Sequence, residues 1–145
     1  MTAATRDLNT SMRGAEENFI GFPVADNVHI YKGTLVALNV AGLAIPAADA
    51  ANAKVMGVAQ EGVDNTLAGH IGGGKTIKVR SGCEVRLPAT SITQAMVGTT
   101  MYVVDDNTFD DAVGTNSIKA GVLTEYVSAT EGYIFIPTTG AARLA

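Results

Sequence analysis

Hydrophobic and polar residues alternate along most of the chain from Asp26 onward, and glycines interrupt the alternation. The pattern is clearest at 76–80 and 83–87, on either side of Ser81 and Gly82. Strict alternation is typical of a half-buried strand, and two such segments around a short turn predict a hairpin. Similar patterns predict strands at 28–31, 34–38, 43–46, 55–59 (continuing toward Val63), 101–104, 119–127 and 132–136.

Helical signals are few. Ser91 is placed to cap a short helical turn over 92–97, which Gly98 would end. Residues 47–53 are rich in alanine and fit either a loop or one helical turn. Because helical crossovers are missing, we predict an all-β fold. We expect a compact β-barrel or sandwich of short antiparallel strands, with an extended N-terminal arm and at most one or two short helical turns.

Residues 1–25 differ from the rest of the chain. Residues 2–18 are mostly small and polar, and the segment ends in an apolar group formed by Phe19, Ile20, Phe22 and Pro23. Such a segment favours an arm that docks on a partner, and a terminus packed on its own domain is the alternative. We therefore predict an arm (1–25), a β domain (26–137) and a C-terminal tail (138–145). The arm is expected to be disordered in the free protein.

A weak internal repeat runs through the β domain. The pairs Gly33-Thr34 and Gly98-Thr99 each precede a strand, and each strand is followed by a Gly-Val pair, Gly57-Val58 or Gly121-Val122. Two related halves could each supply part of a closed or nearly closed sheet, which would remove exposed strand edges.

Composition excludes several classes of protein. The chain has 145 residues with a net charge of −4, and a chain with so few cations is a poor candidate for binding nucleic acid. A single cysteine, Cys83, excludes a disulfide framework and a cysteine-rich zinc site. No apolar run is long enough to span a membrane, and the first residues lack the apolar segment of a secretory signal.

Residues 69–76 match the G-x-x-x-x-G-K-[ST] pattern of a phosphate-binding loop. Such a loop needs a buried strand before it and a helix after it, whereas Ile77 begins an alternating strand-like segment. A flexible glycine turn is therefore the better interpretation. The acidic segment 105–111 fits a solvated hairpin tip better than a calcium site.

Catalytic signals are also weak. Cys83 is expected to be a small buried hydrophobic residue, and neither His29 nor His70 is placed with it in a recognisable nucleophile motif. We therefore expect no enzymatic activity, no cofactor and no metal.

Short motifs spread from Thr5 to Ile136 carry a resemblance to a known group of proteins. They are Thr5-Arg6, Pro23-Val24-Ala25, Ile30-Tyr31-Lys32-Gly33, the segments 35–39 and 55–59, Val63-Asp64-Asn65, Val79-Arg80-Ser81-Gly82 and the segment 102–106. With them, the chain resembles the head-decoration, or capsid cement, proteins of tailed bacteriophages. The resemblance implies a β-rich structural protein, typically a homotrimer, that binds the major capsid protein on the outer surface of an expanded capsid after synthesis in the host cytoplasm.

The candidate partner-binding residues lie in the expected arm. Arg6 and Arg13 could pair with carboxylates of the shell, and Phe19, Ile20, Phe22 and Pro23 could fill a groove on the shell or on a neighbouring subunit. Alternatively, the aromatic residues close the bottom of the chain's own barrel. Two other functions remain open, a head-fibre base or tail component and a small-ligand-binding β module that uses the 69–76 loop.

Overall fold

The computed structural model describes residues 3–13 and 18–137, and the predicted all-β fold is confirmed. All the strand ladders are antiparallel, and the described residues contain one short 3-10 turn and no α-helix. The elements are β1 (Met12–Arg13), β2 (Asn18–Pro23), β3 (His29–Ile30), β4 (Leu35–Leu38), β5 (Ala44–Pro46), β6 (Lys54–Ala59), β7 (Val63–Asp64), β8 (Thr76–Ser81), β9 (Cys83–Pro88), η1 (Gln94–Met96), β10 (Thr100–Asp105), β11 (Thr108–Asp110), β12 (Lys119–Ser128) and β13 (Glu131–Ile136).

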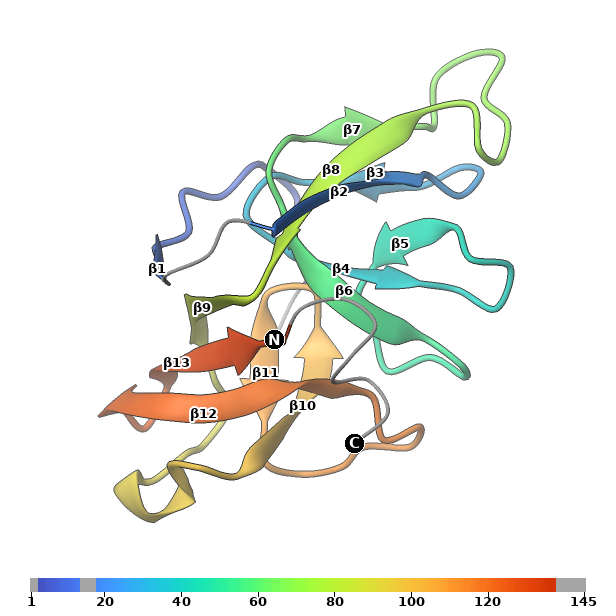
Figure 1. Cartoon of the computed structure of the whole chain (residues 1–145). Coiled ribbons are helices and arrows are strands. Elements are labelled where there is room, and N and C mark those ends of the chain that lie inside the picture. The colour runs from blue at the N-terminus through green and yellow to red at the C-terminus, as the bar shows by residue number, and fades with distance from the viewer. Residues whose placement is uncertain (1–2, 14–17, 138–145) are drawn as a thin grey trace.

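The strands form two main sheets. One has the order β2-β8-β6-β4-β5 and the other β1-β9-β13-β12-β10-β11, while β3 and β7 form a small separate sheet. In Figure 1 the first sheet occupies the upper part of the molecule and the second the lower part. Neither sheet closes into a barrel, so the sandwich-like alternative describes the fold.

The strand topology repeats between the two halves of the chain, as the internal repeat suggested, but each half forms a sheet of its own and not part of one closed sheet. Residues 18–81, here the first half, contain β2, β8, β6, β4 and β5 as neighbours, and residues 83–136, the second half, contain β9, β13, β12, β10 and β11 in the corresponding order. In each half, a single parallel bridge joins the residue after the strand at one edge of this order (β2 or β9) to the strand at the other edge (β5 or β11). The bridges are Val24 with Ala44 and Ala89 with Phe109.

The register also repeats. In each half the central ladder skips one residue next to a glycine, Gly57 or Gly121. The pairs that flank the skipped residue are Val36 with Gly57 and Ala37 with Val55 in the first half, and Met101 with Gly121 and Tyr102 with Lys119 in the second. A skipped residue bends the strand and increases its twist, so both halves curve at the same place.

The predicted hairpin at Ser81-Gly82 is wrong. β8 and β9 belong to different sheets, and β9 pairs with β13. A tight hairpin needs about two residues between its strands, whereas only Gly82 separates β8 from β9. Gly82 has a φ of 69°, and its N–H donates to the carbonyl oxygen of Ile136 at 2.8 Å. It therefore acts as a bend that carries one continuous segment from the first sheet into the second.

The predicted helical turn is shorter than expected and begins later. It covers Gln94–Met96, and Thr93 rather than Ser91 is its N-cap, without a side-chain capping bond. Residues 47–53 form no helix.

The segment expected to be an arm lies against the domain in its described parts. β2 pairs along its whole length with β8, and Val24 and Ala25 are buried. Upstream, the N–H of Leu8 donates to the carbonyl oxygen of Lys32 at 2.7 Å, and β1 pairs with β9. The strand pairing thus extends across the boundary expected at residue 25, because residues 18–23 pair with 76–81 as the first strand of the five-stranded sheet.

Two clusters of buried side chains form the core. The larger cluster combines residues of both halves, such as Leu35 and Val55 with Leu123 and Ile134. The smaller one lies within the first half and comprises Val24, Ile30, Val36, Ala44, Ala59, Ile77 and Val79. Neighbouring residues of β4 face different clusters and are both fully buried, so β4 is covered on both faces.

Candidate functional site

The outer edge of β2 is the main candidate for a binding surface. β2 is the first strand of its sheet, and no described strand pairs with its other side. The N–H of Val24 donates to the carbonyl oxygen of Lys75 at 2.8 Å, on the β8 side. Because bonding directions alternate along an antiparallel strand, Phe22 and Ile20 also point their backbone groups toward β8. Phe19 and Gly21 therefore direct their N–H and C=O groups away from the sheet.

The equivalent edge in the second half is covered. There β9 occupies the place of β2, and β1 pairs with it at Val85 and Glu84. The N–H of Arg86 donates to the carbonyl oxygen of Ser11 at 2.9 Å, and Met12 packs against the larger core cluster. The first half thus lacks, among the described residues, the strand that completes the second half.

Side chains on the covered strand β9 are more buried than their counterparts on β2. Val85 and Leu87 of β9 are 0% and 1% exposed. Ile20, which faces Val79 as Val85 faces Ile134, is 38% exposed, and Phe22 is half-buried against the smaller cluster. Phe19 is 41% exposed on the opposite face, where the ammonium group of Lys78 lies 5.0 Å from its ring centre.

The candidate residues do not form one cluster. Phe19, Ile20, Phe22 and Pro23 share β2, as their sequence spacing suggested. Arg6 is exposed in the segment that precedes β1, and Arg13 is paired through its backbone with Glu84 at the edge of the other sheet. The Arg13 side chain lies outside what the structure describes. The expected alternative, in which the aromatic residues close the chain's own core, holds only for Phe22.

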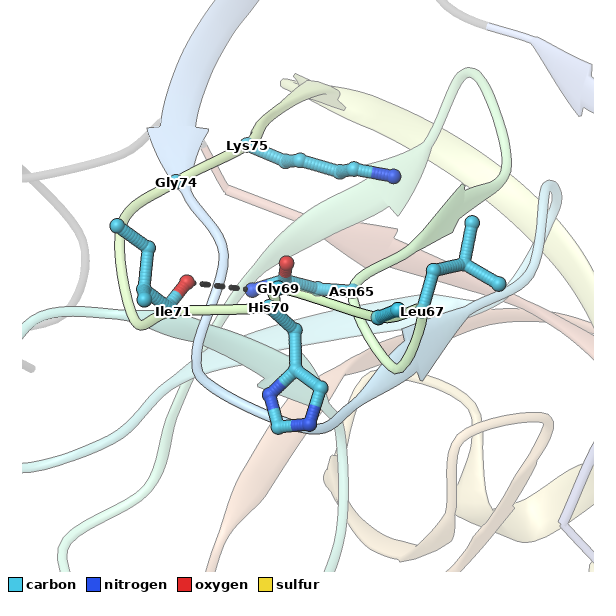
Figure 2. A pocket seen from close by; sticks show the side chains of 8 residues that line it. Asn65, Leu67, Gly69, His70, Ile71, Gly74 and Lys75 are labelled. Carbon is cyan, nitrogen blue, oxygen red and sulfur yellow. Dashed lines mark hydrogen bonds between the residues drawn. The ribbon is translucent and has the colours of Figure 1, made fainter.

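The glycine loop forms a second concave site with a volume of about 360 Å³. Its lining residues are Asn65, Leu67, Ala68, Gly69, His70, Ile71, Gly74 and Lys75. Figure 2 shows the Asn65 side chain bonded to the carbonyl oxygen of Ile71, with Lys75 above them in this view.

The loop's donors are largely used within the chain. The N–H groups of Gly73 and Gly74 donate to the carbonyl oxygens of Val24 and Ile71 at 2.8 and 3.1 Å, and the Nζ of Lys75 donates to the carbonyl oxygen of Asp64 at 2.8 Å. The loop leads directly into strand β8. A phosphate cradle requires free N–H groups at a helix N-terminus, so this geometry favours the expected glycine turn.

Sequence reasoning missed the residue that holds this loop. Asn65 is 2% exposed, and its Nδ2 donates to the carbonyl oxygens of Ala25 and Ile71, both at 2.9 Å. His70 Nδ1 contacts Asp26 Oδ1 at the loop's outer side, and His29 Nδ1 lies 3.8 Å from Asp64 Oδ2. The only sequence signal was a single polar residue beside a glycine-rich segment, which most loops would also show.

The acidic segment forms the turn between β10 and β11, as predicted, but one carboxyl is not solvated. Asp106 is 2% exposed, and its Oδ1 accepts a hydrogen bond from the N–H of Ala4 at 2.9 Å. Burial raises the pKa of Asp106, and the Ala4 N–H partly opposes this shift. Across residues 3–13 and 18–137, no three His, Cys, Asp or Glu side chains are grouped to hold a metal ion.

Cys83 is buried, as predicted. It is 0% exposed, and burial raises the pKa of its thiol even though the charge of Arg80 acts in the opposite direction. A thiol with a raised pKa is a weak nucleophile near neutral pH.

No protein-family model matches this chain, and no curated protein matches it either. None of the described residues belongs to a helix of the length and hydrophobicity needed to cross a membrane.

Proposed function

We propose that this chain is a structural protein of a tailed bacteriophage head that binds the major capsid protein on the outside of the expanded shell. The proposal rests on the resemblance carried by the motifs between Thr5 and Ile136. In this role the protein acts by binding across the boundaries between shell subunits. Apolar burial that exists only on the assembled shell would contribute about 25 cal/mol per Å² before the costs of association.

The observation that carries the proposal is the open edge of β2 with its two exposed apolar side chains, Phe19 and Ile20. Proteins that remain monomeric usually protect such an edge with charges, a covering segment or a bulge. In the part of the chain that the structure describes, no segment covers this edge, and an exposed apolar edge favours assembly with another chain. The opposite end of the N-terminal segment adds an exposed cation, Arg6, that could meet carboxylates of the shell.

The test is a binding experiment with shells from the phage that encodes the chain. Purified protein is mixed with expanded and with unexpanded shells, and co-sedimentation measures the bound fraction. We expect saturable binding to expanded shells alone, because the docking positions are created by expansion. Equal binding to both shells, or binding to purified tails only, would contradict the proposal and favour the head-fibre or tail alternative.

A matched variant separates this function from ligand binding in the glycine loop. Lys75→Ala removes the hydrogen bond from the Nζ of Lys75 to the carbonyl oxygen of Asp64. Shell binding should be unchanged in this variant if the loop is a structural turn. Loss of binding to a nucleotide or sugar in the same variant would instead support the small-ligand module.

A further inference from the structure

We propose that the edge of β2 pairs with the same edge of a second copy of this chain, in a two-fold antiparallel junction centred on Ile20. The inference goes beyond the proposed function, because it concerns two copies of the chain and requires no shell. It also differs from the three-fold assembly that the sequence resemblance implies.

The backbone of β2 is self-complementary in this register. Phe19 and Gly21 both direct their N–H and C=O groups outward, as the pairing of β2 with β8 requires. With the two-fold axis at Ile20, Phe19 of one copy faces Gly21 of the other, and the two such pairs form about four backbone hydrogen bonds.

Pro23 disfavours the neighbouring register. If the axis passed through Gly21, Phe19 of one copy would face Pro23 of the other. Proline has no N–H, so the carbonyl oxygen of Phe19 would then have no donor. Among registers in which both Phe19 and Gly21 face described residues of β2, the one centred on Ile20 satisfies both groups of each residue.

The side chains fit the same register. Ile20 lies on the core-facing side of β2, opposite Val79, and would meet Ile20 of the second copy. Residues directly opposite in a non-hydrogen-bonded pair approach most closely, so each isoleucine would cover the other. On the outer face Phe19 would lie next to Gly21 of the second copy, where the Thr76 side chain borders the site: its Cγ2 is 3.1 Å from the position that a Cβ on Gly21 would take.

In the second half of the molecule, an added strand at the equivalent edge buries the side chain that corresponds to Ile20. There β1 lies on β9, and Val85, the counterpart of Ile20, is 0% exposed instead of 38%. The chain's own β1 is engaged at β9, so it is not free to cover β2 as well. Residues 19–23 carry no charge, so the edge strand itself sets no charge against its copy. The nearest cation is the ammonium group of Lys78, which lies 5.0 Å from the centre of the Phe19 ring.

The junction would be small. A stable interface buries about 800 Å² on each partner, and a single edge strand with two half-exposed apolar side chains provides less than that. We therefore expect a weak dimer whose population depends on protein concentration, and one that is strengthened when a shell or another surface brings two copies together.

The experiment combines sedimentation equilibrium with amide hydrogen exchange on the full chain over a wide range of concentrations. We expect a monomer–dimer equilibrium, with the N–H groups of Phe19 and Gly21 becoming protected as concentration rises. The N–H groups of Ile20 and Phe22 point toward β8 and should be protected at every concentration, so they serve as an internal control.

Two matched variants test the contact between the two Ile20 side chains at the two-fold axis. Ile20→Lys places two ammonium groups face to face at the axis and should weaken dimerisation at least about tenfold. Val104→Lys is the control, because Val104 is 37% exposed on β10, a strand with neighbours on both sides, and it should leave dimerisation unchanged. Circular dichroism checks that both variants fold.

Three results would overturn the inference. A chain that stays monomeric, with fast exchange at Phe19 and Gly21, has an edge that does not self-associate. A trimer without concentration-dependent protection at these groups would place the contact elsewhere. Protection of both groups at high dilution would mean that the chain's own residues cover the edge. The first two results leave binding to shells to the sedimentation test with expanded shells. The third would also remove the open edge on which the proposed function rests, and the shell-binding test would then decide that function without it.

Discussion

Asp106 carries a buried carboxyl group in the turn between β10 and β11. Its Oδ1 accepts the N–H of Ala4, 102 residues away in sequence, and the carbonyl oxygen of the same residue accepts the N–H of Leu35 at 2.7 Å. Because burial raises its pKa in the folded state, ionising Asp106 favours the unfolded chain. The protonated form predominates in both states at low pH, so the penalty there is absent.

We predict that Asp106→Asn changes the pH dependence of stability. The folded-state pKa is raised, so the wild-type protein loses stability from this group as pH rises through the range between its unfolded and folded pKa values. The variant cannot ionise and keeps an oxygen for Ala4. The difference in Tm, variant minus wild type, should therefore increase between pH 3 and pH 7, whatever constant offset the substitution brings. Thermal unfolding followed by circular dichroism measures it, and a difference that stays constant or falls with pH would refute the assignment.

At the scale of strands, the repeated register depends on two glycines. A Cβ on Gly57 would lie 2.2 Å from the carbonyl oxygen of Arg80, and a Cβ on Gly121 would lie 2.3 Å from that of Phe135. Both glycines therefore allow the central strand of their half to approach the next strand closely. The two contacts are counterparts, since Arg80 and Phe135 occupy equivalent places in β8 and β13.

We predict that Gly57→Ala and Gly121→Ala each destabilise the fold by about 1–3 kcal/mol, because a strand must shift to admit the methyl group. Gly72→Ala is the matched control. Its new methyl group would have Cδ1 of Leu43 at 3.4 Å as its nearest neighbour, so little change is expected. Urea unfolding gives all three values, and unequal losses at Gly57 and Gly121 would show that the repeat is not energetically symmetric.

Strand positions could be read from the sequence, but strand partners could not. Alternation over 76–80 and 83–87 correctly marks β8 and β9. Whether these strands pair depends on the number of residues between them and on β13, which lies about 50 residues downstream and provides the ladder for β9. Local composition carries no information on such a distant partner. The repeated Gly-Thr and Gly-Val pairs did indicate a repeated unit, because in each half they accompany the same bent ladder, β4 with β6 and β10 with β12.

The candidate binding surface was predictable in part. A short apolar group in a polar context indicated Phe19, Ile20, Phe22 and Pro23, and the first two are exposed. That these residues form an edge strand could not be foreseen, since the pairing of β2 with β8 joins positions about 58 residues apart. Arg6 and Arg13 were grouped with them by sequence proximity alone, and the structure separates them.

At the scale of the whole molecule, the N-terminal segment ties the two halves together. Thr10 Oγ1 donates to the carbonyl oxygen of Gly33 at 2.6 Å in the first half, while Ser11 and Met12 contact the second half through β9. The segment thus spans the junction between the halves instead of extending away from it.

We predict that Thr10→Val loosens this segment without unfolding the domain. Loss of one hydrogen bond contributes about 0.5–1.5 kcal/mol, so amide exchange at Leu8 and Arg86 should become about 2- to 13-fold faster. Exchange at Leu123, whose N–H donates to the carbonyl oxygen of Thr99 at 3.0 Å inside the second half, should be unaffected. Fast exchange at Leu8 in the wild-type protein would instead support the detached arm expected from the sequence.

The bond from Ala4 to Asp106 has a consequence for synthesis on the ribosome. Ala4 finds its partner only after 102 further positions have been translated, whereas Leu8 and Thr10 bond to Lys32 and Gly33 in the first half. Until then the early half of the polypeptide presents Leu35 and Val55 to solvent, because the side chains that bury them belong to the later half. Nascent chains are therefore most exposed to aggregation or chaperone binding midway through translation.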